Sequence, residues 1–139
     1  MDPKVYSKFA DELFRTIEDK LEEFEEEIDY DRTPDKLEAT IETTGKKIVV
    51  NTQRAIHEIW LAGNSRGWHF QYDEDQTCWF AQAEKVEFYS CLSELLSTNL
   101  GRQVSFNWGF REKQLVSQGQ NVYKIVFTFN YLTVPVESW

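Results

Sequence analysis

Cysteine, histidine and proline are scarce in this sequence, with two, two and three copies among 139 residues. The two cysteines, Cys78 and Cys91, form no CxxC pair, and Cys91 falls at an apolar helical position. We therefore interpret both as reduced structural residues rather than as a disulfide framework. The histidines, His57 and His69, lie on separate predicted strands without a carboxylate at metal-site spacing, which favours sheet residues over metal ligands.

Motifs of the common enzyme classes are absent too. There is no GxSxG, HExxH, P-loop or GxGxxG pattern, so no catalytic residue is assigned. Lysine and arginine do not cluster, and the net charge of −9 would repel phosphates, so nucleic acid is not an expected partner. Residues 1–10 lack the apolar core of a signal peptide, and no apolar run is long enough to span a bilayer. We therefore expect a cytoplasmic protein without a membrane partner.

What the sequence has in excess is negative charge in one place. Residues 18–31 hold nine carboxylates and one lysine, which makes −8 of the net −9 of the chain. A need for solubility alone would distribute acids over the surface. The concentration therefore indicates a local role, such as binding a cation or a basic partner.

Apolar residues recur at helical spacing in two segments that flank a run of short alternating segments. Residues 3 to about 24 are typical of one amphipathic helix with Asp2 as its N-cap, and residues 86–101 of a second helix that ends at Gly101. Between them the period changes to two, which predicts an antiparallel meander. This order predicts an α+β fold, a two-layer sandwich with two helices packed on one face of an antiparallel sheet. The predicted strands are 37–43, 47–52, 57–62, 68–72 and 77–80, with turns at 44–45 and 63–67.

Alternation along the strands also predicts what the uncovered sheet face displays. If Ile59 and Leu61 point toward the helices, then Glu58 and Trp60 point away from them. An outward tryptophan is a candidate for partner recognition. A neighbouring strand, a loop or the C-terminal tail could cover Trp60 instead, and the alternation does not decide between these readings.

Residues three and four apart on a helix are neighbours, so the carboxylates of the first helix form two adjoining rows. Acids at the C-terminal end of a helix also oppose its dipole, at a cost of roughly 0.3–1 kcal/mol each. A bound cation would relieve the repulsion, and carboxylates suit hard ions such as iron, manganese, calcium or magnesium. A solvated face and a surface for a basic protein are the alternatives, whereas a carboxylate-dependent hydrolase would need a concave pocket.

An ordered set of segments resembles the frataxin family, and its bacterial CyaY branch in particular. The resemblance covers about the first 107 residues. It implies the same two-layer α+β sandwich. The segments that carry it are the acidic helix end at 17–24, the step into a first strand at 29–31, a strand at 37–41, Asn51-Thr52-Gln53, Ile59-Trp60-Leu61-Ala62, Gly67-Trp68-His69-Phe70, and a closing helix with Phe88, Leu92, Leu95 and Leu96.

The resemblance also implies a function, that of an iron-binding accessory protein in iron–sulfur cluster assembly. Such a protein donates iron to, or regulates, a cysteine desulfurase and its scaffold protein. Fe²⁺ or Fe³⁺ would bind weakly to an exposed acidic ridge, with other divalent cations as alternatives and weak ferroxidase activity as a secondary property. We expect a monomer or iron-dependent oligomers, and a metal-independent acidic adaptor is the competing interpretation. The acidic ridge corresponds to Glu18, Asp19, Glu22, Glu23, Glu25, Glu27, Asp29 and Asp31, and the partner-binding motif of the sheet to Asn51, Gln53 and Trp60.

The last part of the chain has no counterpart in this resemblance. We divide the chain into a frataxin-like domain at residues 1–107 and a C-terminal extension at residues 108–139. Strict alternation in the extension predicts an extra strand, which could pair with a sheet edge of this chain or with another chain. The alternating residues are Tyr123, Ile125, Phe127, Phe129 and Tyr131.

Overall fold

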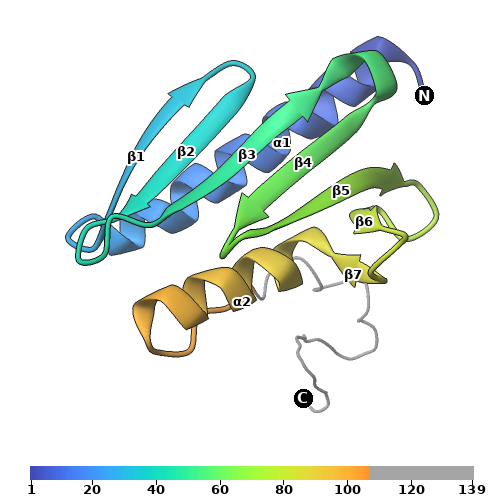
Figure 1. The fold of residues 1–139 in the computed structure, drawn as a ribbon. Coiled ribbons are helices and arrows are strands. Elements are labelled where there is room, and N and C mark those ends of the chain that lie inside the picture. The colour runs from blue at the N-terminus through green and yellow to red at the C-terminus, as the bar shows by residue number, and fades with distance from the viewer. Residues whose placement is uncertain (107–139) are drawn as a thin grey trace, which may run out of the picture. The chain divides into compact units, whose positions relative to one another are not determined.

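A helix, a meander of strands and a second helix follow one another in the computed structural model, which describes residues 1–106 (Figure 1). The compact unit described below is Met1–Gln103. The elements are α1 (Pro3–Leu21), a 3-10 turn (Glu22–Phe24), β1 (Ile28–Thr33), β2 (Lys36–Ile41), β3 (Lys47–Gln53), a 3-10 turn (Arg54–Ile56), β4 (Glu58–Gly63), β5 (Arg66–Asp73), β6 (Cys78–Ala81), β7 (Val86–Glu87) and α2 (Phe88–Leu100).

Helix α1 begins and ends close to where the sequence predicts. The Asp2 side chain accepts a hydrogen bond from the Lys4 backbone N–H at 2.6 Å, and Pro3 occupies the first turn. The predicted last turn is present but tightens into the 3-10 turn Glu22–Phe24. One side of α1 is buried, at Tyr6, Ala10, Leu13, Phe14, Ile17 and Leu21.

Seven strands form one sheet in the order of the sequence, and every neighbouring pair is antiparallel. The predicted meander is therefore confirmed. Period-two alternation did not predict strand β1, because after Ile28 its helix-facing residues are Tyr30 and Arg32, which carry no apolar alternation. Strand β1 is nevertheless paired along its whole length with β2.

Both helices pack on the same face of the sheet, which confirms the α+β sandwich. The ring of Tyr6 in α1 meets Trp79 in β6 edge to face at 5.8 Å, and Phe88 in α2 meets Phe70 in β5 at 5.0 Å. In Figure 1, α1 runs behind the strands, so the opposite sheet face is turned toward the viewer. Gly63 allows α2 to approach β4, because an added Cβ would lie 3.2 Å from a Leu95 methyl group.

Three boundaries differ from the prediction for local reasons. His57, expected at the start of a strand, has φ +56° and ends the 3-10 turn before β4. Val86, expected in the second helix, lies in β7, and the helix starts only after Glu87, whose side chain caps it. The loop expected at 63–67 is a two-residue turn, in which Asn64 and Ser65 both have positive φ as tight antiparallel hairpins require.

Two predictions fall wholly or largely beyond the part of the chain that the structure describes. The extra strand expected between Tyr123 and Tyr131 lies there, and so does nearly all of the proposed C-terminal extension at 108–139. The division of the chain at residue 107 stays a prediction. Within residues 1–106, no helix is both long and apolar enough to cross a membrane.

Candidate functional site

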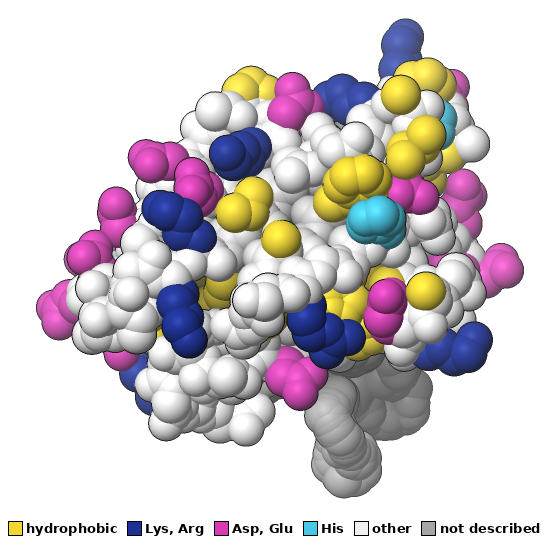
Figure 2. All heavy atoms as spheres, in the orientation of Figure 1, with side chains coloured by type: hydrophobic (Ala, Val, Ile, Leu, Met, Phe, Trp, Pro, Cys, Tyr) yellow, Lys and Arg dark blue, Asp and Glu magenta, His cyan; other side chains and the backbone are white. Residues whose placement is uncertain are grey.

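The predicted acidic ridge is built where α1 ends and the chain turns into the edge strand β1. Asp19, Glu22, Glu23 and Glu25 are exposed, whereas Glu18 and Glu27 are partly covered. Acidic side chains gather along the left side of Figure 2, where β1 and β2 lie in Figure 1. Lys20 is the only base in the last turn of α1, and the first turn holds no acid. The charge therefore opposes the helix dipole, as the sequence predicts.

Two carboxylates of the ridge pair with bases close to the helix. Arg32 Nη1 donates to Glu18 Oε1 at 2.6 Å, and both side chains are about three-quarters buried, with exposed fractions of 23% and 26%. The Arg32 guanidinium also lies over the Phe14 ring, 4.7 Å from its centroid. Lys20 Nζ lies 3.3 Å from Glu23 Oε1. Glu18 is thus held in place by the fold.

A third carboxylate of the ridge belongs to an ion pair between distant parts of the chain. Two guanidinium nitrogens of Arg102 donate to the two oxygens of Glu27, at 2.6 and 2.5 Å. These hydrogen bonds lower the pKa of Glu27 below its usual value. The pair joins the turn before β1 to the residue that follows the cap of α2.

The remaining ridge residues have no ion pair within residues 1–106. They are Asp19, Glu22, Glu25, Asp29 and Asp31. Two of them, Glu22 and Asp19, act on Tyr30, whose pKa is raised first by burial and then by Glu18, Glu22 and Asp19. Unpaired carboxylates close enough to raise a neighbouring pKa favour the binding of a cation.

The structure divides the eight predicted ridge residues between two sides of β1. Tyr30 and Arg32 face α1, so Asp29 and Asp31, the alternate residues, lie on the opposite side of the strand. There Asp29 pairs in register with Thr40 of β2, and Asp31 with Glu38. The helix part of the ridge and its strand part therefore project from different faces of the same edge.

The donor set of the ridge fits hard cations, but it forms no closed cage. Carboxylate oxygens suit iron in either oxidation state as well as magnesium and calcium. No group of three or more His, Cys, Asp or Glu side chains within residues 1–106 is arranged to hold a metal ion. A cation at this surface would be held by one or two carboxylates and water, which predicts weak binding and fast exchange.

The second predicted site, on the open face of the sheet, is organised by direct contacts. Ile59 and Leu61 are 0% and 1% exposed, while Trp60 between them is half-buried on the opposite face, as alternation predicts. The Trp60 ring stacks on His69 of β5, with ring centroids 4.0 Å apart and planes 9° from parallel. Trp60 Nε1 donates to Glu58 Oε1 at 2.8 Å. Trp60 is therefore partly covered by a neighbouring strand and still accessible from solvent.

Neighbouring residues complete what we call the sheet-face cluster. Gln71 Nε2 donates to the second oxygen of Glu58 at 2.6 Å. On β3, Gln53 Nε2 donates to Asn51 Oδ1 at 3.1 Å, and Asn51 lies opposite Trp60 in the β3–β4 register. In Figure 2 a histidine lies beside apolar side chains on this face. The cluster is Asn51, Gln53, Glu58, Trp60, His69 and Gln71.

Sequence reasoning missed three members of this cluster. Glu58, His69 and Gln71 were not proposed as site residues, because His69 becomes a neighbour of Trp60 only through the β4–β5 register. The tight turn at Asn64 and Ser65 sets that register, and a turn of two residues places residues 60 and 69 opposite each other. Predicting the two-residue turn would have identified the pair.

The cysteines are structural, in agreement with the sequence. Cys91 is buried and Cys78 is partly buried, and both are free. Burial raises the pKa of each thiol to about 12. Neither thiol is therefore a reactive thiolate near neutral pH.

Comparison with known proteins places the fold in one family. A family model described as the frataxin-like domain matches residues 1–102. Among solved structures, the chain is similar to a frataxin from Psychromonas ingrahamii that has been used to study stability within the CyaY protein family. The two share 28% sequence identity with a TM-score of 0.68, and the match covers 76% of this chain and 97% of that one.

Proposed function

Because this chain belongs to the frataxin family, whose members act in iron–sulfur cluster assembly, we propose that it is an iron-binding accessory protein of that process. In this proposal the acidic ridge holds Fe²⁺ or Fe³⁺ weakly and docks on a basic surface of a cysteine desulfurase. The sheet-face cluster contacts the scaffold protein. Iron is cargo here rather than a resident cofactor.

The observation that supports the ridge assignment best is the group of carboxylates without an ion pair beside the end of α1. Asp19, Glu22 and Glu25 lie within about two helical turns, and no described base pairs with them. Their mutual repulsion costs stability, roughly 0.2–0.5 kcal/mol for each close pair. A cation or a basic protein surface would relieve this cost.

The metal-independent adaptor is the second candidate function. It is favoured by the lack of a preformed group of three or more metal-binding side chains among residues 1–106. An adaptor would use the same carboxylates for protein contact alone. The two candidates therefore differ only in whether iron binds at the ridge without a partner.

Paramagnetic line broadening by Fe²⁺ under anaerobic conditions separates the two candidates. In the full chain, we expect Fe²⁺ to broaden the amide signals of residues 18–31 first. The triple variant Asp19→Lys, Glu22→Lys, Glu25→Lys should lose this localised broadening. Glu18 is left unchanged because it pairs with Arg32, so its loss would disturb the fold as well as the charge.

A matched variant controls for net charge. Glu74, Asp75 and Glu94 are exposed and lie away from the ridge, so Glu74→Lys, Asp75→Lys, Glu94→Lys changes the total charge equally. This control should keep the broadening at residues 18–31. Equal broadening in the ridge variant would contradict the iron assignment. Sulfide release by the desulfurase at defined iron, with either variant, would then show whether the ridge acts through iron or through contact alone.

A further inference from the structure

The sheet opens on one side of β5, beside the sheet-face cluster. Strands β5 and β6 pair only from Gln71 to Asp73, with Gln71 opposite Phe80. Continued in the same register, the ladder would place Gln82 opposite His69 and Glu84 opposite Gly67. Instead the chain turns at residues 82–85, where Lys85 has φ +58° and its N–H donates to the Ala81 carbonyl at 2.8 Å, and returns as β7.

Among the described residues, this turn leaves one edge of the β5 backbone without a strand neighbour. Within residues 1–106, Arg66–Phe70 pair with β4 on one side only. Gly67 and His69, and also Gln82, Ala83 and Glu84 across the gap, are all exposed. An unpaired strand edge carries backbone donors and acceptors that a second extended chain can use.

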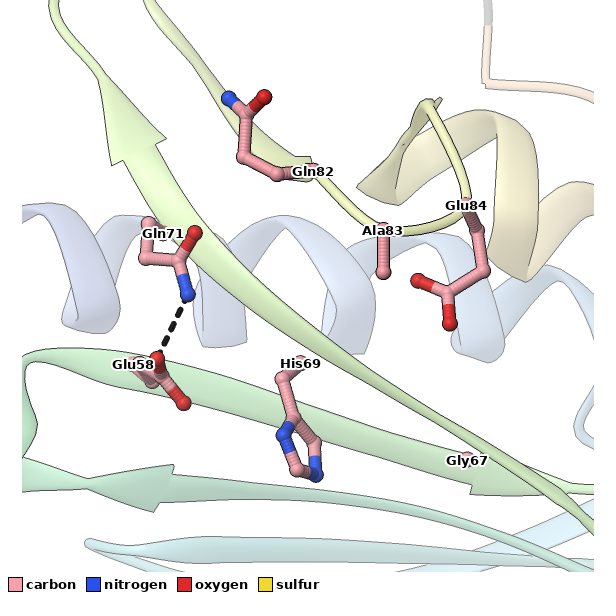
Figure 3. Close-up of a pocket in the computed structure, with 7 residues that line it drawn as sticks. All are labelled: Glu58, Gly67, His69, Gln71, Gln82, Ala83 and Glu84. Atoms are coloured by element: carbon pink, nitrogen blue, oxygen red, sulfur yellow. Dashed lines mark hydrogen bonds between the residues drawn. The ribbon is translucent and has the colours of Figure 1, made fainter.

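A cavity of about 350 Å³ occupies the gap between β5 and the turn. Figure 3 shows Glu84 and Ala83 directed from the turn toward β5, with His69 and Glu58 on the other wall. The seven lining residues are Glu58, Gly67, His69, Gln71, Gln82, Ala83 and Glu84.

The lining is negatively charged and partly preorganised. The described residues that line the cavity include two carboxylates and neither lysine nor arginine. Glu58 is held by Trp60 Nε1 and by Gln71 Nε2, one on each carboxylate oxygen, and each oxygen retains a lone pair for a further donor. The amide groups of Gln71 and Gln82 add further acceptors. A planar basic group that approached the cavity would meet charge-assisted acceptors on both walls.

We propose that this gap binds an extended segment of a protein partner, which adds to the free edge of β5 and places an arginine side chain between Glu58 and Glu84. Main-chain hydrogen bonds to the strand supply affinity, and the acidic cavity selects the basic residue. The inference rests on the proposed function, since the gap shares Glu58 and His69 with the surface assigned to the scaffold protein. It requires no iron at the acidic ridge.

A synthetic peptide tests the proposal on the full chain by NMR. The probe is acetyl-Thr-Val-Arg-Val-Thr-amide, and two comparison peptides carry glutamate in place of arginine or N-methyl groups on alternate backbone nitrogens. We expect the probe to cause saturable shifts at Gly67, His69, Ala83 and Glu84, and both comparison peptides to bind more weakly. Equal binding of the glutamate peptide would remove the arginine from the proposal, and equal binding of the N-methyl peptide would remove strand addition.

A pair of single variants tests the cavity itself. Glu84→Gln should raise the Kd of the arginine peptide roughly two- to fivefold, as expected for one exposed charge partner, and Glu42→Gln should leave the Kd unchanged. An unchanged Kd in Glu84→Gln, or shifts confined to other residues, would overturn the proposal. Shifts of Gly67 and Ala83 that depend on protein concentration without peptide would assign the edge to a second copy of this chain instead.

The peptide experiment and the iron experiment test separate proposals, so a negative result in one does not contradict the other. The peptide is read at residues 67–69 and 82–84, whereas Fe²⁺ is read at residues 18–31. The variant Asp19→Lys, Glu22→Lys, Glu25→Lys should therefore bind the arginine peptide as the unmodified chain does. If the unmodified chain bound the arginine peptide but showed no localised Fe²⁺ broadening, the iron assignment of the ridge would be wrong. The proposal for the β5 edge would still hold.

Discussion

The carboxylates at the end of α1 and the aromatic pair in the middle of the sheet differ in how the fold holds them. Asp19, Glu22 and Glu25 are exposed and have no described ion pair. Trp60 and His69, in contrast, stack at 4.0 Å and are fixed by the strand register and by Glu58. The first surface can adjust to a hydrated ion or to a varied basic surface. The second presents one fixed shape, which suits a specific protein partner.

The largest expected effect concerns binding at the sheet face. Trp60→Ala should weaken binding to the scaffold protein by about 2 kcal/mol or more, because a central aromatic residue is a typical hot spot. The free energy of unfolding should change less, by about 1 kcal/mol, because Trp60 is only half-buried. Isothermal titration and urea unfolding measure the two quantities. A conservative Trp60→Phe control should retain most of the affinity, and full affinity in Trp60→Ala would remove this residue from the interface.

The next effect concerns Glu18, the ridge carboxylate that is paired with the partly buried Arg32. Glu18→Gln leaves Arg32 partly buried beside Phe14 without its charged partner. We expect the free energy of unfolding to fall by roughly 1 kcal/mol. Chemical unfolding of this variant and of Glu12→Gln, an exposed residue on the same helix, provides the comparison. Equal stability of the two variants would mean that Glu18 is as loosely held as its neighbours.

Neutralising the unpaired carboxylates should instead increase the free energy of unfolding. Glu22→Gln and Glu25→Gln each remove repulsion at the C-terminal end of α1, so each should stabilise the protein by roughly 0.2–0.5 kcal/mol. The gain should shrink as salt is added, because ions screen exposed charges. Thermal unfolding across a salt series measures this. Destabilisation by either change would show that the residue has a stabilising partner after all.

The smallest expected effect is on the pKa of Tyr30, which is sensitive to the negative charge of the ridge in the absence of metal. Burial is the main cause of the raised pKa of Tyr30, and Glu18, Glu22 and Asp19 raise it further. Glu22→Gln should therefore lower the pKa of Tyr30 slightly toward its normal value, and a bound cation should lower it too. Ultraviolet titration of the phenolate, with Tyr30→Phe to identify the signal, measures the shift. A pKa that moves upward in Glu22→Gln would contradict the assigned field.

Much of the fold was predictable because its signals are local. The apolar spacing of α1 and α2 predicted both helices, and period-two alternation predicted five of the seven strands. Alternation did not predict strand β1, because its helix-facing residues Tyr30 and Arg32 are not an apolar series. Arg32 can face the helix because its charge is paired with Glu18. Strand β7 has two residues, too few for any periodicity to be detected.

The two surfaces were predictable to different extents. The acidic ridge follows from consecutive residues on one helix, so helical spacing alone places its members side by side. Its division by β1 was not predictable, because it depends on which side of the edge strand faces α1. Among sheet residues, the sequence identified Asn51, Gln53 and Trp60 but not Glu58, His69 or Gln71, whose roles depend on pairing between strands.

By itself the sequence determined the concentration of charge, the two amphipathic helices and the outward direction of Trp60, because each of these depends on residues close together in the chain. Only the tertiary structure decided which carboxylates are paired and that His69 stacks on Trp60. It also decided that the pairing of β5 with β6 stops at Gln71, where a gap opens between β5 and the turn at residues 82–85. These features depend on strand register and on ion pairs between distant residues, such as Glu27 and Arg102. Such contacts are set by the packing of the whole domain, which local periodicity does not encode.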